Sequence, residues 1–147
     1  MRFLTTLLIV AVATACAPAD QPAEEQAEQP AGPTLADFAG TWQGMATLEG
    51  VEDPVPTTVS GTAEGAGWTM TLEGRPEIAV HVTVVGDSLI MESDEYESVL
   101  RAGVMVTVRT ASVLQDGMLV GNLVATYKAP EGDEIVAGTV ESTRAPQ

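Results

Sequence analysis

Short runs rich in Val, Thr, Met and Leu recur along most of this 147-residue chain, and Gly, Asp or Pro separates each run from the next. Runs of this kind with turn residues between them are typical of β-strands joined by tight connections. One helical turn is expected at 34–38, where Thr34 precedes Asp37 by three residues, and little helical periodicity follows it. The pattern predicts eight strands, at 41–49, 56–63, 67–73, 77–85, 88–93, 104–114, 117–128 and 134–143.

Turns and alternation support several of these strands. Asp116-Gly117 lies between two apolar runs and is a strong hairpin signal. The run 78–84 alternates clearly, so that one face of its strand carries Ile78, Val80, Val82 and Val84. The segment 94–103 is ambiguous, because it reads either as a long loop or as a strand with a bulge at Gly103.

These strands predict an all-β fold, arranged as an antiparallel up-and-down meander of about eight strands. A meander has to hide its edge strands, which a closed or nearly closed barrel does. A β-sandwich is the alternative. Residues 34–147 form one domain, which is large enough for a single modest core.

The first 15 residues have the form of an export signal. Arg2 precedes an uncharged apolar stretch of about 13 residues, whereas a membrane-spanning helix needs about 20. Ala13-Thr14-Ala15-Cys16 then resembles the bacterial lipobox, which implies a signal peptide at 1–15, cleavage before Cys16 and lipid on that cysteine. An ordinary cleaved signal followed by an incidental cysteine is the alternative.

Cys16 is the only cysteine, so no intrachain disulfide can form. The lipobox resemblance implies a diacylglyceryl group on its sulfur and an additional N-acyl chain, and two or more chains attach a protein stably to a membrane. We therefore expect an exported protein that is anchored to the cell envelope through acyl chains on Cys16. Ala17 stands where an aspartate would favour the inner membrane, which points to the periplasmic face of the outer membrane in a diderm organism.

Residues 16–33 are expected to form a disordered acidic, Pro-rich tether, because they carry no large apolar side chain that could offset the entropy of ordering. Residues 34–147 hold five basic and 17 acidic side chains, a formal charge of −12. Nucleic acid would be repelled by this charge, so it is excluded as a partner.

The start of the first strand carries a family resemblance. Gly40-Thr41-Trp42 resembles the first strand of the lipocalin-like, or calycin, barrels, in which a tryptophan lies across the closed end. Arg144 stands near the end of the last strand, where lipocalins place an arginine on that indole. The resemblance implies barrel-closing structural roles for Trp42 and Arg144. No helix follows the last strand and no disulfide exists, which departs from the lipocalin pattern.

Catalytic motifs are missing from the sequence. His81 is the only histidine and lies mid-strand opposite Val80 and Val82, where a surface or rim position is expected. Zinc sites of the Cys/His type, nucleophile-elbow serines and phosphate-binding glycine loops are absent. We therefore expect no cofactor, no metal and no enzyme activity, with an uncharacterised hydrolase as the least favoured alternative. One acidic cluster could gather around Ca²⁺ but is better interpreted as a solvated loop; it comprises Glu92, Asp94, Glu95 and Glu97.

Two functions remain open. The barrel interior could hold a small apolar molecule, or it could be filled by side chains while the outer surface meets another envelope protein. In the strand expected at 104–114, Arg109 could point inward and bind a ligand carboxylate, although an outward position beside a carboxylate is favoured. The candidates for lining a ligand site are Trp68, Met70, Val82, Met91, Val106 and Arg109.

Overall fold

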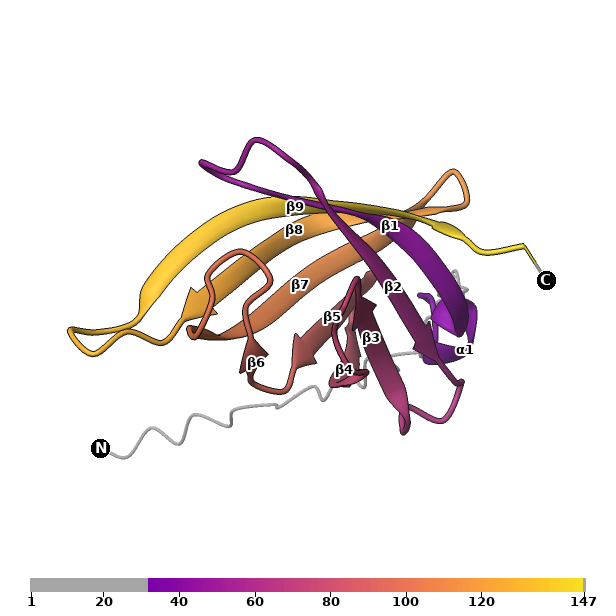
Figure 1. Cartoon of the computed structure of the whole chain (residues 1–147). Coiled ribbons are helices and arrows are strands. Elements are labelled where there is room, and N and C mark those ends of the chain that lie inside the picture. The colour runs from indigo at the N-terminus through magenta and orange to yellow at the C-terminus, as the bar shows by residue number, and fades with distance from the viewer. Residues whose placement is uncertain (1–31, 147) are drawn as a thin grey trace, which may run out of the picture. The chain divides into compact units, whose positions relative to one another are not determined.

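The computed structural model describes residues 32–146, which form one small all-β domain (Figure 1). A single helical turn, α1 (Leu35–Phe38), precedes the strands. The strands are β1 (Gly40–Leu48), β2 (Val55–Gly61), β3 (Trp68–Leu72), β4 (Ile78–Val85), β5 (Ser88–Ser93), β6 (Tyr96–Glu97), β7 (Met105–Gln115), β8 (Met118–Tyr127) and β9 (Glu134–Arg144). Within this range no helix is long and apolar enough to cross a membrane. The predicted signal peptide, Cys16 and nearly all of the tether lie outside the described residues.

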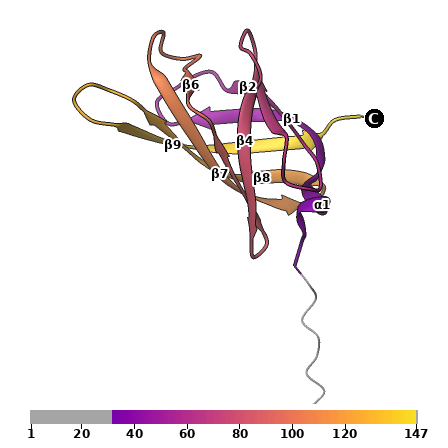
Figure 2. The same cartoon turned by 90° about the horizontal axis from the view of Figure 1, so that it is seen from below.

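The strands form a closed meander barrel. Apart from β5 and β6, each strand pairs antiparallel with the next along the chain, and β9 pairs with β1. Because β5 pairs directly with β7, eight strands make a complete wall, and β6 adds to the edge of β7. Figures 1 and 2 show the long curved strands β7, β8 and β9 wrapping across from β2, β3 and β4. Closure leaves the long strands without free edges. The predicted barrel is thus confirmed, and the β-sandwich alternative was wrong.

The hairpin between β7 and β8 forms where Asp116-Gly117 predicts it. Asp116 has φ +51° and Gly117 has φ +79°. Positive φ at both central residues is what a two-residue type I′ hairpin turn requires. The pairing of Gln115 with Met118 continues without interruption to that of Val106 with Tyr127. This turn therefore fixes the register of β7 against β8.

The segment 94–103 is neither of the two structures that we expected. Glu92 pairs with Arg109, but Tyr96 pairs with Val106, so the β5–β6 side holds one residue more than β7. The bulge therefore lies between Glu92 and Tyr96, and Gly103 instead occupies a turn with φ +74°. The bulge is stable because its backbone finds other partners: Asp94 N–H donates to the Ala79 carbonyl on β4 at 2.9 Å.

One end of the barrel is closed by aromatic side chains. Trp42 donates its indole N–H to the Phe38 carbonyl at 2.7 Å, and Trp68 donates its own to the Thr62 carbonyl at 2.9 Å. The Trp68 ring lies directly over Gly61, where any side chain would collide with it. The core at this end, which α1 covers, includes Phe38, Trp42, Trp68, Leu89 and Leu119.

The opposite end of the barrel is lined by a second and smaller core. Its buried members are Ala46, Leu48, Val106, Leu123, Ala125, Tyr127 and Val140. Large rings plug the covered end, whereas mostly small or aliphatic side chains line the other end. We call this other end the mouth, and its rim includes the segment 98–104 between β6 and β7.

Candidate functional site

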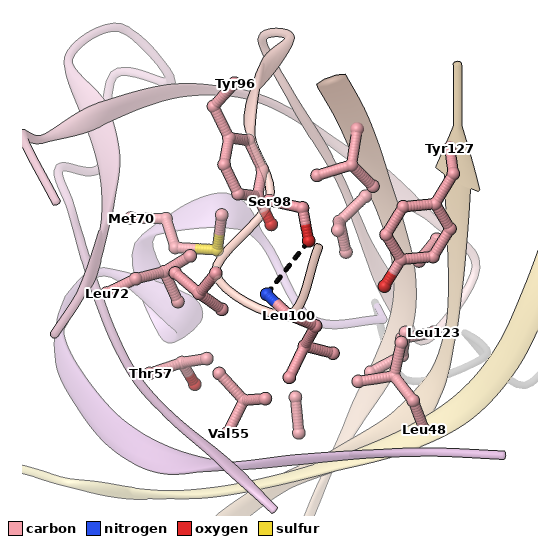
Figure 3. Close-up of a pocket in the computed structure, with 15 residues that line it drawn as sticks. Leu48, Val55, Thr57, Met70, Leu72, Tyr96, Ser98, Leu100, Leu123 and Tyr127 are labelled. Carbon is pink, nitrogen blue, oxygen red and sulfur yellow. Dashed lines mark hydrogen bonds between the residues drawn. The ribbon is translucent and has the colours of Figure 1, made fainter. Parts of the chain in front are cut away.

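Two small cavities lie inside the barrel. The outer cavity begins at the mouth, where Figure 3 shows Met70, Leu72, Leu100 and Tyr127 directed toward a common space. Its wall is formed by Ala46, Leu48, Val55, Thr57, Met70, Leu72, Tyr96, Ser98, Val99, Leu100, Val106, Val108, Leu123, Ala125 and Tyr127. The wall is almost wholly apolar, which suits a hydrocarbon group.

The inner cavity lies deeper in the same barrel. It adds Val59, Val80, Met91, Ser93, Thr110 and Val140 to residues that also line the outer cavity. The two cavities share Ala46, Thr57, Met70, Val108 and Leu123. Because these five side chains belong to both walls, the cavities are neighbours along the barrel interior.

The free space is narrow. In each cavity about 50 Å³ is wide enough to hold the centre of a water molecule. About 10–15 Å³ of such space holds one water, so each cavity has room for only a few small groups. A bulky ring system would require the walls to move apart, whereas an unbranched chain needs the least additional width.

No charged side chain lines either cavity. The polar wall groups are hydroxyls, among which Tyr96 and Ser98 lie at the mouth and Ser93 and Thr110 lie deeper. Burial, together with nearby Tyr127, raises the pKa of Tyr96 to about 12, so its hydroxyl stays neutral over the physiological range. A charged ligand group inside the barrel would lose its hydration without gaining an ion pair, which is unfavourable.

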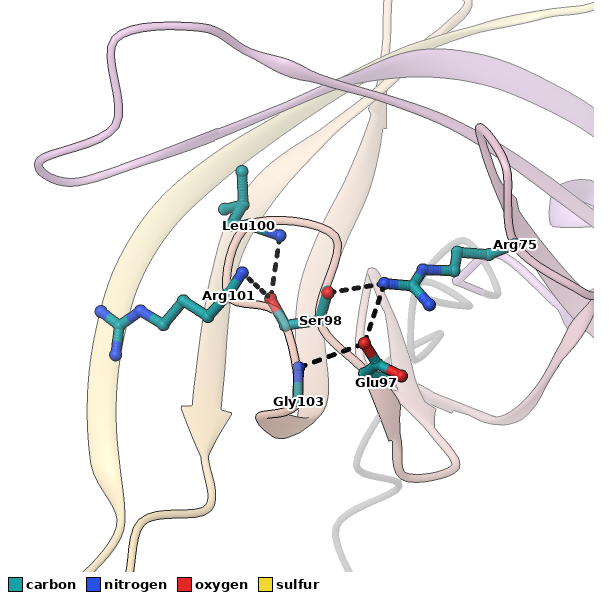
Figure 4. Close-up of polar contacts among 6 residues, drawn as sticks. All are labelled: Arg75, Glu97, Ser98, Leu100, Arg101 and Gly103. Atoms are coloured by element: carbon teal, nitrogen blue, oxygen red, sulfur yellow. Dashed lines mark hydrogen bonds and ion pairs between the residues drawn. The ribbon is translucent and has the colours of Figure 1, made fainter.

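The segment 98–104 forms a strap across the mouth (Figure 4). The buried Ser98 hydroxyl accepts the N–H groups of Leu100 at 3.0 Å and Arg101 at 3.1 Å, which fixes the turn. Arg75, from the β3–β4 connection, donates to the Ser98 carbonyl at 2.9 Å and contacts Glu97 at 3.5 Å. These contacts hold Leu100 over the outer cavity while leaving it 40% exposed.

Arg101 ties the strap to the far wall of the mouth. Its guanidinium lies 4.1 Å from the centre of the Tyr127 ring on β8. It also donates two hydrogen bonds to the carboxylate of Glu134 on β9, at 2.6 and 2.8 Å. Arg101 holds the pKa of Glu134 below its ordinary value. The strap is thus held on one side by Arg75 and on the other by Arg101.

The site residues predicted from the sequence, both the lining candidates and the barrel-closing pair, lie in different parts of the barrel. Met70, Met91 and Val106 line the cavities. Trp68 is buried at the covered end, and Val82 is partly buried against the same core. Neither of them lines these two cavities. Trp42 and Arg144 lie together at the covered end, with the guanidinium 4.3 Å from the ring centre.

Arg109, which could have pointed inward to a ligand carboxylate, lines neither cavity and takes the outward position that the sequence favoured. It is exposed on the outer face of β7, where it pairs with Glu92 of β5 and Val124 of β8. The reason is the strand's alternation: Thr110 faces inward, so its neighbour must face outward. An inward arginine would also have been a buried charge without a partner.

The remaining polar candidates lie on the surface. His81 is exposed on β4 and contacts Asp94 at 2.9 Å, and Glu97 belongs to the strap contacts. Among residues 32–146, no three potential metal ligands come together. The acidic side chains of 92–97 are thus not gathered around one point in the described part of the chain.

Several residues at the mouth were missed from sequence. They are Tyr96, Ser98, Leu100, Tyr127 and the deeper Thr110. Both faces of β7 and β8 carry apolar residues, so alternation alone does not select the inward one. The turn at Asp116-Gly117 fixes the register of β7 against β8, but not which face is inside.

Comparison with known proteins found no family model, no curated protein and no solved structure that matches this chain.

Proposed function

We propose that this protein is an exported, lipid-anchored envelope protein whose barrel holds one slender, uncharged apolar molecule. The observation that carries the proposal is the unfilled apolar interior, which runs from the mouth down to Ser93 and Thr110. The covered end differs, because the large rings of Phe38, Trp42 and Trp68 are packed there. An interior that needed only to be stable could have been packed in the same way along its whole length.

The width and charge of the interior define the class of ligand. Walls without a charged side chain favour an uncharged group. The narrow free space favours an unbranched alkyl chain over a ring system. A lipid acyl chain, a long-chain alcohol and a linear hydrocarbon all meet both conditions.

The proposed anchor rests on the sequence alone, because Cys16 lies outside the described residues. The tether joins the domain just before α1, and α1 covers the closed end of the barrel (Figures 1 and 2). The mouth is thus at the other end from the point where the tether joins.

A side-chain-filled module that binds another envelope protein is the second candidate. The small size of the cavities, about 50 Å³ each, favours it. In that case the interior space is a packing defect, and function lies on the outer surface.

Native mass spectrometry of the protein purified from its own envelope separates the two candidates. All strand pairings lie within residues 40–144, so a chain released by mild proteolysis in the tether keeps the complete barrel. Extra mass that leaves on gentle activation supports the ligand carrier. A bare domain in every growth condition contradicts it and favours the filled module.

A titration series of n-alkanols then tests the channel itself, with a chain that begins at residue 16 and carries Cys16→Ser. Each added methylene that enters the barrel contributes about 0.8 kcal/mol, or roughly fourfold in affinity. We expect affinity to rise with chain length and then level off once the interior is full. A rise that continues without a limit would indicate detergent-like adsorption to the surface.

A further inference from the structure

The inner cavity contains a hydroxyl group with an unused hydrogen-bonding capacity. Thr110 lines this cavity, is 9% exposed, and its Oγ1 is buried without any hydrogen-bond partner. Buried polar atoms are almost always paired, since an unpaired one costs about 1–3 kcal/mol. The other unpaired buried hydroxyl among the described residues, Ser112, lines neither cavity.

Ser93 provides a second polar group beside it. Its Oγ accepts the Val108 N–H at 2.9 Å, and a hydroxyl that accepts a hydrogen bond still has its own hydrogen to donate. Met91 pairs with Thr110 across β5 and β7, and Ser93 follows Met91 on the same inward face. Ser93 and Thr110 are therefore diagonal neighbours on the adjacent strands β5 and β7, a relationship in which residues lie about 7–8 Å apart. One polar group between them can bond both.

The remainder of the wall shows what kind of polar group fits. No lysine, arginine or histidine lines either cavity, so a carboxylate or phosphate would be buried without a counter-charge. A ligand hydroxyl needs one donor and one acceptor, whereas a ligand carbonyl needs only a donor, and the hydroxyls of Ser93 and Thr110 can supply both.

From these observations we propose that Ser93 and Thr110 form a polar subsite at the inner end of the barrel. It binds the uncharged hydroxyl or carbonyl end of a slender alkyl ligand, while the alkyl chain extends toward the mouth. This subsite rests on the proposed function, and it specifies both the polar end of the ligand and its direction in the barrel.

The test compares three probes of equal carbon number: 1-octanol, octane and octanoate. The ε-methyl NMR signals of Met70 and Met91 report binding, because both side chains line the cavities, whereas Met45 and Met105 are exposed and serve as internal references. We expect 1-octanol to bind more tightly than octane, and octanoate to bind most weakly. Replacing Thr110→Val keeps the shape but removes the hydroxyl, so it should weaken 1-octanol binding about three- to tenfold and leave octane binding unchanged.

Three further variants guard against a loss of structure. Thr110→Ser keeps the hydroxyl and should retain the preference for 1-octanol. Thr107→Val removes a hydroxyl from the outer face of β7, and it should bind 1-octanol as the unaltered chain does. Ser112→Ala removes a buried hydroxyl that lines neither cavity, and it should also leave 1-octanol binding unchanged.

The outcomes separate the subsite from the function. If 1-octanol and octane bind equally, or if Thr110→Val leaves 1-octanol binding unchanged, the subsite is wrong while the apolar cavity stands. If no probe shifts the Met70 and Met91 signals, the proposed function itself fails.

Discussion

The guanidinium of Arg144 lies 4.3 Å from the centre of the Trp42 ring, at the end of the barrel that α1 covers. The two residues pair across the first and last strands, where the barrel closes. Arg144 also donates to the carbonyl of Asp37 at 2.9 Å and to that of Ala39. One side chain thus connects the strand closure, the indole and α1.

Replacing Arg144→Gln should therefore destabilise the barrel. The change removes the contact with the ring and both hydrogen bonds, and since Arg144 is exposed we expect a loss of about 1–2 kcal/mol in the free energy of unfolding. Urea denaturation measures this loss. Arg109→Gln is the matched control, because Arg109 is also exposed and stands mid-strand; its effect should stay within about 0.5 kcal/mol. Equal effects of the two changes would show that Arg144 contributes nothing special to the closure.

The β7–β8 turn and the inner face of β4 could be predicted from the sequence, because residues adjacent in the chain determine both. Asp116-Gly117 favours positive φ at two successive positions, which few other dipeptides tolerate. In β4 the alternation of Ile78 and Val80 with Ala79 and His81 marks the inner face directly. In such places, neighbouring residues alone carry the information.

Other features depend on contacts between distant residues. In β7 the residues around Arg109 are apolar on both faces, so its outward direction follows only from the pairing of β7 with β5 and β8. The bulge after Glu92 depends on the Ala79 carbonyl of β4 as a partner. The strap at 98–104 is held by Arg75 and Glu134, which are far away in sequence. The mouth of the candidate site therefore could not be read from the chain alone.

The ion pair between Arg101 and Glu134 predicts an acid-sensitive contribution to stability. Because Arg101 holds the pKa of Glu134 below its ordinary value, the folded state binds this proton less tightly than the unfolded state. The contribution is therefore present above the unfolded pKa, roughly 4.3, and is lost as the pH falls through the lowered folded value. We expect Glu134→Gln to destabilise the protein at pH 6 but not at pH 3, measured by urea denaturation. In an Arg101→Gln background, the stability loss caused by Glu134→Gln should no longer depend on pH. A pH dependence that remained would show that it does not arise from the ion pair with Arg101.

Tyr96 predicts a loss of stability at alkaline pH. Burial raises its folded pKa to about 12, whereas an unfolded tyrosine ionises near 10. The contribution of the neutral Tyr96 hydroxyl to the free energy of unfolding is complete below about pH 10. It is lost as the pH rises toward 12, because the unfolded state releases the hydroxyl proton at a lower pH than the folded state does. Absorbance titration at the tyrosinate band should show a component near pH 12 that disappears in Tyr96→Phe. A titration without this late component would mean that the Tyr96 hydroxyl is solvated.

The lipid anchor can be tested separately from the barrel. Cells that express the chain should incorporate labelled palmitate into it, and Cys16→Ser should abolish the labelling, since Cys16 is the only cysteine. The altered protein should also leave the membrane fraction, because the proposed acyl chains on Cys16 are what attaches it there. Palmitate that remained on the Cys16→Ser chain would contradict an anchor at this position.

Ala46 offers the most direct test of a ligand inside the barrel. It is 9% exposed and lines both cavities, so Ala46→Leu should place three additional carbon atoms where the two cavities meet. Each cavity has free space of about 50 Å³, and filling such space commonly adds about 0.5–2 kcal/mol of stability. We expect the variant to unfold at the same or a higher urea concentration.

The same variant should lose at least about tenfold in affinity for 1-octanol, since one displaced pair of methylenes alone is worth about 1.6 kcal/mol. Ala137→Leu is the matched control, because Ala137 is exposed on the outer face of β9. A stable Ala46→Leu barrel that no longer binds would locate the ligand between the walls, whereas undiminished binding would exclude the interior and move the search to the outer surface. Stability and affinity have to be measured together, because a destabilised barrel could lose 1-octanol binding through partial unfolding. A variant that is at least as stable as the unaltered chain loses binding only because its cavity is filled.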